Sequence, residues 1–255
     1  MASLDNIPLP LVGLAYLVLL LAGIEVGLRG YRWMNARRDR EGEPGGHEFL
    51  LSAVLGLLAL LLGFTFSVSL SRYDARRSLV MQEANAIGTT WLRAELLQEP
   101  YRTEMTGLLR RYADARIAWS DADGPIGPTL AVQQQVWAAT GRAIRGESSQ
   151  VLSRGLMESM NESIDAQGSR LAARAAHIPG RVLRILVIYS AVAMVMLGYT
   201  LGGAGRPRRV ATLLMTVLLA LAVSVIIDLD RPRSGRIQVS QQPLLDVRAS
   251  MGPAP

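Results

Sequence analysis

The sequence predicts an all-α membrane protein in which two transmembrane helical hairpins flank a helical extramembrane domain. Apolar residues are concentrated in four blocks of about twenty residues, the length that a helix needs to cross ~30 Å of hydrocarbon. A charged or glycine-rich stretch separates the two blocks of each pair. No stretch shows the alternation of apolar and polar residues that is typical of a half-buried strand.

The first pair of blocks spans about residues 9–28 and 49–70. Pro8 and Pro10 stand at the start of the first block, where a helix tolerates proline because its first amides have no partners. Arginines follow this block rather than precede it, so it reads as a retained anchor and not as a cleaved signal peptide. Small residues recur at helical spacing in the second block, and they predict a face that another helix can approach closely. These residues are Gly56, Ala59, Gly63, Ser67 and Ser71.

The middle of the chain is predicted to be helical. Residues 72–97 contain no proline and one glycine, so we expect the second membrane helix to continue well beyond the membrane. An apolar stripe at helical spacing follows over 101–119, and a further helical stretch over 129–176 carries three glycines that could interrupt it. The segment 177–180 contains adjacent proline and glycine and predicts a break before the membrane.

The second pair of blocks spans about residues 182–201 and 210–229, joined by a short turn. The residues after it are polar, contain several prolines and show no strong period. The predicted organisation is a first hairpin at 1–71, an extramembrane domain at 72–181 whose first helix continues the second span, a second hairpin at 182–230 and a polar tail at 231–255.

Four crossings place both termini and the middle domain on one side of the membrane and the two hairpin loops on the other. The loops carry eight arginines, and charge in short loops favours their cytoplasmic placement. Those loop arginines are Arg29, Arg32, Arg37, Arg38, Arg40, Arg206, Arg208 and Arg209. Eight further arginines flank the membrane on the opposite side, so the sequence leaves the orientation open. These are Arg72, Arg76, Arg77, Arg174, Arg181, Arg231, Arg233 and Arg236.

Composition excludes several classes of chemistry. The chain has no cysteine, which rules out disulfides, thiolate chemistry and cysteine metal sites. His47 and His177 are its two histidines, and neither has a second nitrogen ligand at helical spacing, so we expect no zinc site and no cofactor. The net charge of +6 comes from arginines beside the apolar blocks, where anionic lipid headgroups rather than nucleic acid are the expected partner. No catalytic motif is present, so we predict that the protein is not an enzyme.

Ser67, Ser71, Arg72 and Arg76 are the candidate pore or pore-mouth residues. The two serines lie four positions apart on one helical face, and the arginines follow where that helix leaves the membrane. In an oligomer they would form a ring that concentrates anions. The alternative is that the serines bond across a packed interface and the arginines reach toward headgroups.

A second polar group is predicted in the stalk that follows, made of Asp74, Arg77, Glu83, Asn85 and Thr89. Asp74 and Arg77 are three positions apart and can form a local ion pair. Asn85 and Thr89 share a face, whereas Glu83 does not lie on it. These residues are either a functional polar network or, more simply, hydrogen bonds between helices of the stalk.

A series of motifs resembles the bestrophin-like domain family, a poorly characterised group of bacterial multi-pass membrane proteins. The motifs are FTFS at 64–67, SRYDARR at 71–77, EANAIGT at 83–89, WLR at 91–93, EPYR at 99–102, YADARI at 112–117, DLDRPR at 228–233 and SQQPLLD at 240–246. The family is distantly related to bestrophins, which are oligomeric anion channels with four membrane helices per subunit. The resemblance implies a homo-oligomer in the bacterial inner membrane. No bestrophin pore motif matches this chain residue by residue, so no functional residue is transferred.

Two interpretations of function follow. The first is an oligomeric, anion-channel-like membrane protein. The alternative is a membrane-anchored interaction or sensory module without transport activity, whose helical domain binds a partner. A channel needs a polar path between subunits, whereas a sensory module needs only packed membrane helices and a binding surface.

Overall fold

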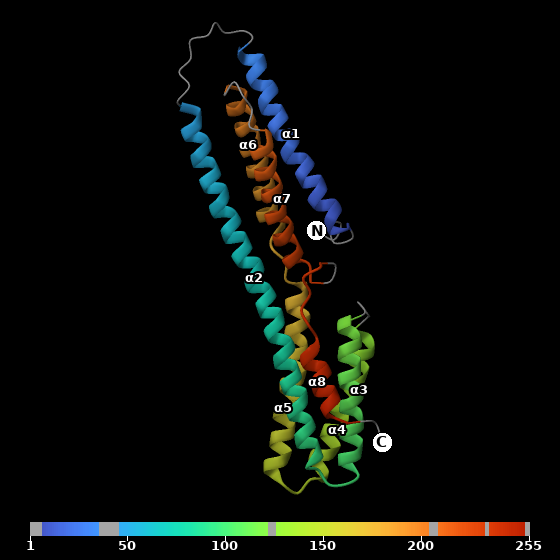
Figure 1. The fold of residues 1–255 in the computed structure, drawn as a ribbon. Coiled ribbons are helices and arrows are strands. Elements are labelled where there is room, and N and C mark those ends of the chain that lie inside the picture. Colours follow the sequence, from blue (N-terminus) through green and yellow to red (C-terminus); the bar gives the residue numbers. More distant parts are fainter. Residues whose placement is uncertain (1–6, 36–45, 122–125, 204–208, 233–234, 253–255) are drawn as a thin grey trace. The chain divides into compact units, whose positions relative to one another are not determined.

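The computed structural model describes residues 7–35, 46–121, 126–203, 209–232 and 235–252, and these residues form helices without any strand. The all-α class predicted from the sequence is confirmed. The helices are α1 (Leu9–Asn35), α2 (Gly46–Glu95), α3 (Tyr101–Asp121), α4 (Gly127–Gly146), α5 (Gln150–Ala175), α6 (Gly180–Gly203), α7 (Arg209–Asp230) and α8 (Gln242–Ser250) (Figure 1).

The chain forms two compact units, which we call the membrane unit (Met1–Arg72 and His177–Gln238) and the helical unit (Tyr73–Ala176 and Val239–Pro255). Helix α2 passes from the first to the second as a single helix. Among the residues that the structure describes, four helical segments are long and apolar enough to cross a bilayer, which confirms the predicted four-span membrane class. They lie within Leu9–Met34, Phe49–Glu95, Gln150–Gly203 and Arg209–Asp230.

Helices α1 and α6 are in direct backbone contact inside the membrane unit. A Cβ atom added to Gly27 would lie 2.0 Å from the carbonyl oxygen of Val195, and one added to Gly198 would lie 2.1 Å from that of Ile24. Only glycine permits this approach. Packing of this kind is typical of membrane helices, which have no hydrophobic effect between them to drive association. Leu20 is fully buried in the same layer.

The face of α2 that carries the five small residues is not the one that packs in the chain. Gly56 and Gly63 have no atom of another element within 4 Å of an added Cβ. Ala59, Ser67 and Ser71 are exposed as well. The close approach expected for this face therefore does not occur within one chain, because the opposite face of α2 supplies the intrachain contacts. On that opposite face, Ser69 donates a hydrogen bond of 3.4 Å to the carbonyl oxygen of Ile226 in α7.

Two buried aspartates end α7 and hold the segments that connect the two units. The Asp228 carboxylate accepts hydrogen bonds from the backbone amides of Arg236 (2.6 Å) and Ile237 (3.3 Å). Asp230 Oδ1 accepts one from the amide of Ile178 (2.8 Å). Nδ1 of His177 lies 3.0 Å from the Asp230 carbonyl oxygen. These backbone bonds satisfy amides that lie outside any helix, which is the usual requirement for buried polar groups.

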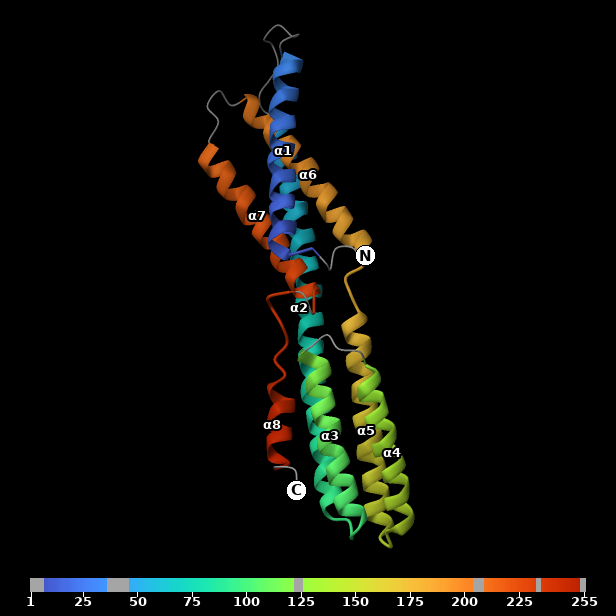
Figure 2. The ribbon, with the colours of Figure 1, turned by 90° about the vertical axis from the view of Figure 1, so that its right-hand side faces the viewer.

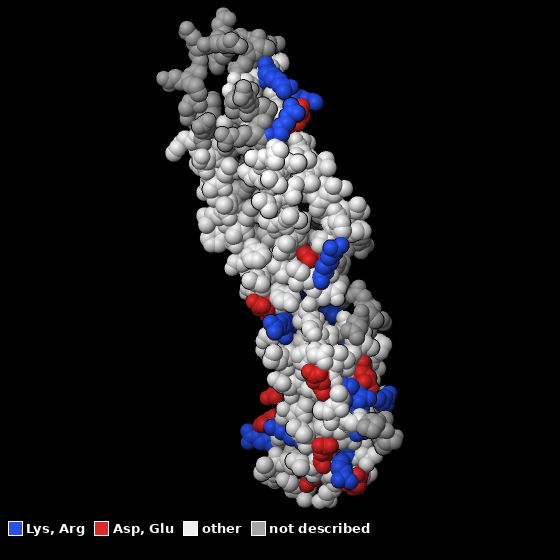
Figure 3. Space-filling view, viewed as in Figure 1, with Lys and Arg blue, Asp and Glu red and all other residues white. Residues whose placement is uncertain are grey.

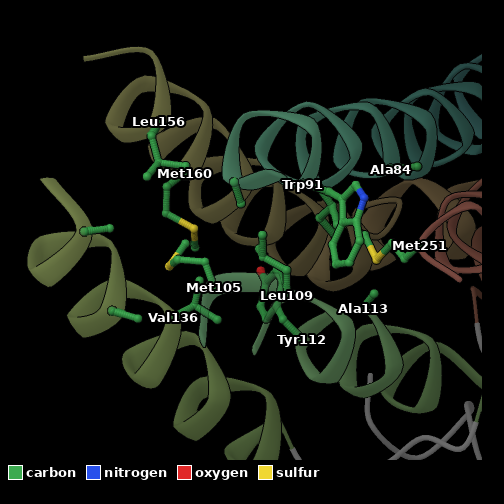
Figure 4. Packing of buried hydrophobic residues seen from close by; sticks show 14 of the residues in the cluster. Ala84, Trp91, Met105, Leu109, Tyr112, Ala113, Val136, Leu156, Met160 and Met251 are labelled. Atoms are coloured by element: carbon green, nitrogen blue, oxygen red, sulfur yellow. The ribbon is translucent and has the colours of Figure 1, made fainter. Parts of the chain in front are cut away.

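The helical unit packs α3, α4, α5, α8 and the second half of α2 around one apolar core. Figure 4 shows side chains from several helices meeting there, among them Trp91 of α2, Leu109 and Tyr112 of α3, and Met160 of α5. The long helical stretch predicted over 129–176 is divided at 147–149. Ser149 caps the start of α5 by accepting a hydrogen bond of 3.3 Å from the amide of Leu152.

Helix α8 was not predicted, because nine residues are too few to show a helical period. It is nevertheless held in place by contacts within the helical unit. Leu244 and Met251 are buried in the core, and the Arg110 guanidinium of α3 donates two hydrogen bonds to the Met251 carbonyl oxygen (3.1 and 2.9 Å). Arg248 also forms an ion pair with Asp114. The polar segment after the last span thus ends as a packed helix rather than an irregular tail.

Charge is distributed differently on the two units. On the face drawn in Figure 3, charged side chains are sparse over the membrane unit and more frequent, with both signs, over the helical unit. Figure 2 shows α1, α6 and α7 of the membrane unit from a second direction. A surface poor in charge suits contact with hydrocarbon, where each exposed charge is costly.

Candidate functional site

The predicted pore-mouth residues differ in their exposure. We call the uncovered face of α2, which carries Gly56, Ala59, Gly63, Ser67 and Ser71, the bare face. Neither the Ser67 nor the Ser71 hydroxyl has a hydrogen-bond partner among the described residues. Arg72 is half-buried, and Arg76 is buried at 7% exposure. The structure therefore places the two serines on one open face. The half-buried Arg72 lies about 100° around the helix from Ser71, and Arg76 is turned into the chain.

The predicted stalk residues are not assembled into one network. Asp74, Arg77 and Asn85 are exposed, Thr89 is half-buried and Glu83 is fully buried. Helical spacing explains the division, because Glu83 shares its face with Arg76 and Thr90, seven positions away on either side, and all three are buried. Of the five residues, Glu83 alone enters a buried polar cluster, and its partners come from other helices.

Glu83 lies between two buried arginines, and we call this group the Glu83 cluster. Its Oε1 accepts a hydrogen bond of 2.5 Å from Nε of Arg116 in α3, and its Oε2 accepts one from Nη1 of Arg170 in α5. Glu83 and Arg116 are fully buried and Arg170 is 5% exposed. Nη2 of Arg170 donates to Ser120 Oγ (2.9 Å) and to Gln241 Oε1 (2.7 Å). The cluster thus ties together four segments of the helical unit.

Trp119 forms one wall of the Glu83 cluster. The guanidinium carbon of Arg174 lies 3.8 Å from its ring centroid, that of Arg116 lies 4.4 Å away and that of Arg170 lies 5.6 Å away. Tyr112 lies nearby and donates a hydrogen bond of 2.8 Å to Oε1 of Gln167. An aromatic face attracts cations through its quadrupole, so the indole offsets part of the positive charge that gathers here.

The charges of the cluster do not balance. One carboxylate faces two guanidiniums, and arginine does not lose its proton in proteins. Burial of each ion costs several kcal/mol of desolvation free energy. A desolvated cation–π contact stabilises by roughly 2 kcal/mol, which is less than that cost. Nη1 and Nη2 of Arg116 are both buried and have no hydrogen-bond partner among the described residues. Burial raises the pKa of the Tyr112 phenol and Glu83 raises it further, whereas burial lowers the pKa of Arg170.

Sequence reasoning identified Glu83 but missed Arg116, Arg170 and Trp119 as its surroundings. A signal for Arg116 was present, because Met105, Leu109 and Arg116 all lie on the buried face of α3 at helical spacing. A charged residue on an otherwise apolar stripe indicates a buried partner. Arg170 gave no such signal, since its neighbours in sequence are mixed.

The described residues do not form a group of three or more acidic or histidine side chains that could hold a metal ion. Of the two histidines, His177 bonds to the end of α7, and the side chain of His47 lies outside the described residues. The donors that converge at the Glu83 cluster are guanidinium N–H groups, which suit anions and not metal cations.

Comparison with solved structures supports the fold. A bacterial bestrophin homologue from Klebsiella pneumoniae, in one single-substitution variant, matches with a TM-score of 0.71 at 14% identity, covering 94% of this chain and 98% of that chain. A second variant of the same homologue matches with a TM-score of 0.70 at 16% identity over 96% and 99%. The structure of a protein described as a membrane protein matches with a TM-score of 0.72 at 14% identity over 93% and 97%.

A search of curated proteins gave no match. The structural likenesses, at identities this low, concern the fold alone. The family model is decisive, because the bestrophin-like domain matches residues 17–244 and so covers most of the membrane unit and the helical unit together. The chain therefore belongs to the bestrophin-like domain family.

Proposed function

We propose that this chain is one subunit of an oligomeric, anion-channel-like protein of the bacterial inner membrane. The observation that carries the proposal is the bare face of α2, where five small residues are all exposed in the single chain. Small residues allow helices from different subunits to approach closely. The family resemblance to bestrophins supports the same interpretation, because bestrophins are oligomeric anion channels.

The interior of a single membrane unit is a poor candidate for a conduction path. Backbones of α1 and α6 touch at Gly27 and Gly198, and Leu20, Leu186 and Met194 are fully buried in the layer around them. A close-packed interior leaves no room for a hydrated ion. A path has to lie between copies of the chain, and α2 is the helix whose polar face is uncovered.

Ser67 and Ser71 favour a wet environment for that face. Thr65 and Ser69, on the other side of the same turns, bond to carbonyl oxygens four positions earlier, whereas Ser67 and Ser71 have no partner among the described residues. An unsatisfied hydroxyl in hydrocarbon is costly. Facing lipid, the two serines would carry that cost, and facing a pore or a partner helix they would not.

Arg72 supplies the anion preference in this proposal. It follows Ser71 directly and is partly accessible, so each subunit would add one positive charge at the same depth. Such a ring raises the local concentration of anions, and salt screens it over ~8 Å at physiological ionic strength. Arg76 is buried and would add to the field without contacting the ion. Anionic lipid headgroups remain the alternative partner for Arg72.

The experiment is a bilayer recording of the purified protein with unequal salt on the two sides. Arg72→Glu should shift the reversal potential toward cation selectivity, because it inverts the charge of the ring. Arg111→Glu is the control, since Arg111 is an exposed arginine of α3 and lies on a different helix from the proposed ring. We expect its reversal potential to stay close to wild type.

Three results would contradict the proposal. One is a monomeric protein in detergent, because a single chain does not enclose a path. Another is an equal shift for both arginine variants, which would indicate a general surface-charge effect. The third is the absence of current at every pH and salt concentration tested, which would favour the membrane-anchored interaction or sensory module.

A further inference from the structure

We propose that Arg116 binds one small monovalent anion, with chloride as the natural occupant, inside the helical unit. The ligands would be the two terminal amino groups, Nη1 and Nη2, of its fully buried guanidinium. This site is separate from the α2 face assigned to conduction, and it stands whether or not the chain conducts.

The first support is the number of donors left over. Nε of Arg116 donates to Glu83, but Nη1 and Nη2 donate to no described residue although both are buried. Because an arginine stays protonated at any accessible pH, these N–H groups remain hydrogen-bond donors. Buried polar groups in folded proteins almost always have a partner, and an exception calls for a bound water or ion.

The second support is the lack of spare acceptors around Arg116. Both carboxylate oxygens of Glu83 are engaged, one by Arg116 and the other by Arg170. The Gln167 oxygen accepts from Tyr112, and the Gln241 oxygen accepts from Arg170. Trp119 attracts the guanidinium through its ring but offers no oxygen lone pair. Among the described residues, therefore, no acceptor is available for these two amino groups, and a bound anion would supply it.

The third support is charge, which also selects the kind of anion. Two guanidiniums share one carboxylate, so the group of Glu83, Arg116 and Arg170 has an excess of one positive charge. One monovalent anion neutralises it, while a water molecule would satisfy N–H groups and leave the charge. The two amino groups are sealed from solvent, which favours a single-atom ion over sulfate or phosphate.

The test is the thermal stability of the full-length protein in detergent while sodium chloride replaces sodium gluconate at constant ionic strength. A ligand that binds only the folded state lowers the unfolding constant about tenfold for each tenfold rise in its concentration above Kd. We expect the melting temperature to rise with chloride and with bromide. Sulfate stabilises folded proteins generally by exclusion from their surface, so it should shift wild type and Arg116→Gln by the same amount.

Matched variants locate the effect. Arg116→Gln should abolish the chloride response. Arg110→Gln should retain it, because Arg110 is an arginine of the same helix that donates to Met251 and stacks on Trp91 instead. Glu83→Gln removes the carboxylate that competes for the guanidiniums, so it should respond at a chloride concentration about tenfold lower or more. This variant keeps the proposal testable where Arg116→Gln does not fold.

Crystals grown in bromide give an independent measurement. An anomalous peak beside Nη1 and Nη2 of Arg116 would support the site directly. The proposal is overturned by a wild-type melting temperature that is the same in chloride and gluconate, by an unchanged chloride response in Arg116→Gln, or by a Glu83→Gln variant that loses stability without any dependence on chloride. None of these outcomes bears on whether α2 lines a pore.

Discussion

Among single side chains, Tyr112 reports on the electrostatics of the Glu83 cluster. Its ring belongs to the apolar core, while its hydroxyl bonds to Gln167 and lies close enough to feel Glu83, Arg116 and Arg170. Burial and the Glu83 carboxylate both disfavour the phenolate, so the pKa of Tyr112 is raised. The nearby guanidiniums oppose this shift but do not cancel it.

Replacement of Tyr112 should change how stability depends on alkaline pH. Below pH about 10 the phenol is protonated in both states and contributes no slope. Above that pH the unfolded chain releases the proton while the folded protein keeps it, so stability falls as pH rises. Tyr112→Phe should remove this part of the decline, and at neutral pH it should cost about 1 kcal/mol for the lost hydrogen bond to Gln167.

Melting temperatures measured between about pH 8 and about pH 11 would check this. Tyr73→Phe, which alters a partly exposed tyrosine of the same unit, is the control. An alkaline decline that is identical in wild type and Tyr112→Phe would show that the raised pKa does not exist.

The sequence could indicate Glu83 as a notable polar residue but not its partners. Arg116 and Arg170 are 33 and 87 positions away in the sequence. The spacing of residues along one helix predicts which of its residues share a face, but it does not predict which other helix that face will contact. The same reason explains Asn85 and Thr89, which share a face as expected but have no partner on it among the described residues. Long-range pairing comes from packing, and a local pattern does not contain it.

Among helices, composition predicted the spans and left their contacts undetermined. Twenty apolar residues suffice to recognise a membrane helix, so all four blocks were found. The contact between α1 and α6 depends on Gly27 and Gly198, which look no different in sequence from Gly56 and Gly63 on the bare face of α2. Helix α8 was missed because it depends on a few residues. The glycines within 129–176 indicated a possible interruption of that stretch but not its position, which is at 147–149.

The close contact between α1 and α6 makes a sharp prediction about Gly198. Its Cβ would lie 2.1 Å from the Ile24 carbonyl oxygen, and backbone cannot move aside as a flexible side chain can. Gly198→Ala should therefore push the helices apart and cost about 1–3 kcal/mol, as overpacking does in other close-packed interiors.

Gly30 provides the matched substitution, because an added Cβ there meets no atom within 4 Å. Gly30→Ala removes a helix-interior glycine and should be neutral or slightly stabilising. The melting temperatures of both variants in detergent would test the contact. Equal stability of Gly198→Ala and wild type would contradict the backbone approach between α1 and α6.

For the whole molecule, chain connectivity relates the two units to the membrane. The helical unit is built from residues 73–176 and 239–255, which follow the second and the fourth span respectively. An even number of crossings precedes each segment. We therefore expect both parts of the helical unit to lie on one side of the bilayer, and the packing of α8 against α3 agrees with this expectation.

The prediction for topology is that the hairpin loops lie together on the side opposite the helical unit. Arg38 and Arg208 mark these loops and lie outside the described residues. The chain has no cysteine, so wild-type protein is a clean background for single-cysteine labelling. Val151→Cys and Ser250→Cys are suitable probes of the helical unit because both positions are exposed, whereas Arg116 is too deeply buried to label.

In sealed inverted vesicles, a membrane-impermeant maleimide should either label both Arg38→Cys and Arg208→Cys or label neither. Val151→Cys and Ser250→Cys should be protected where the loop positions are labelled, and labelled where the loop positions are protected. If the two loop positions differ from one another, the four-span topology is wrong, because two crossings must return the chain to the same side. Which pair is labelled also settles orientation, which arginine counts leave open with eight residues on either side of the membrane. If the loop positions are protected from labelling on intact cells, the loops are cytoplasmic and the helical unit is external. This orientation is the one that the positive charge of the short loops favours.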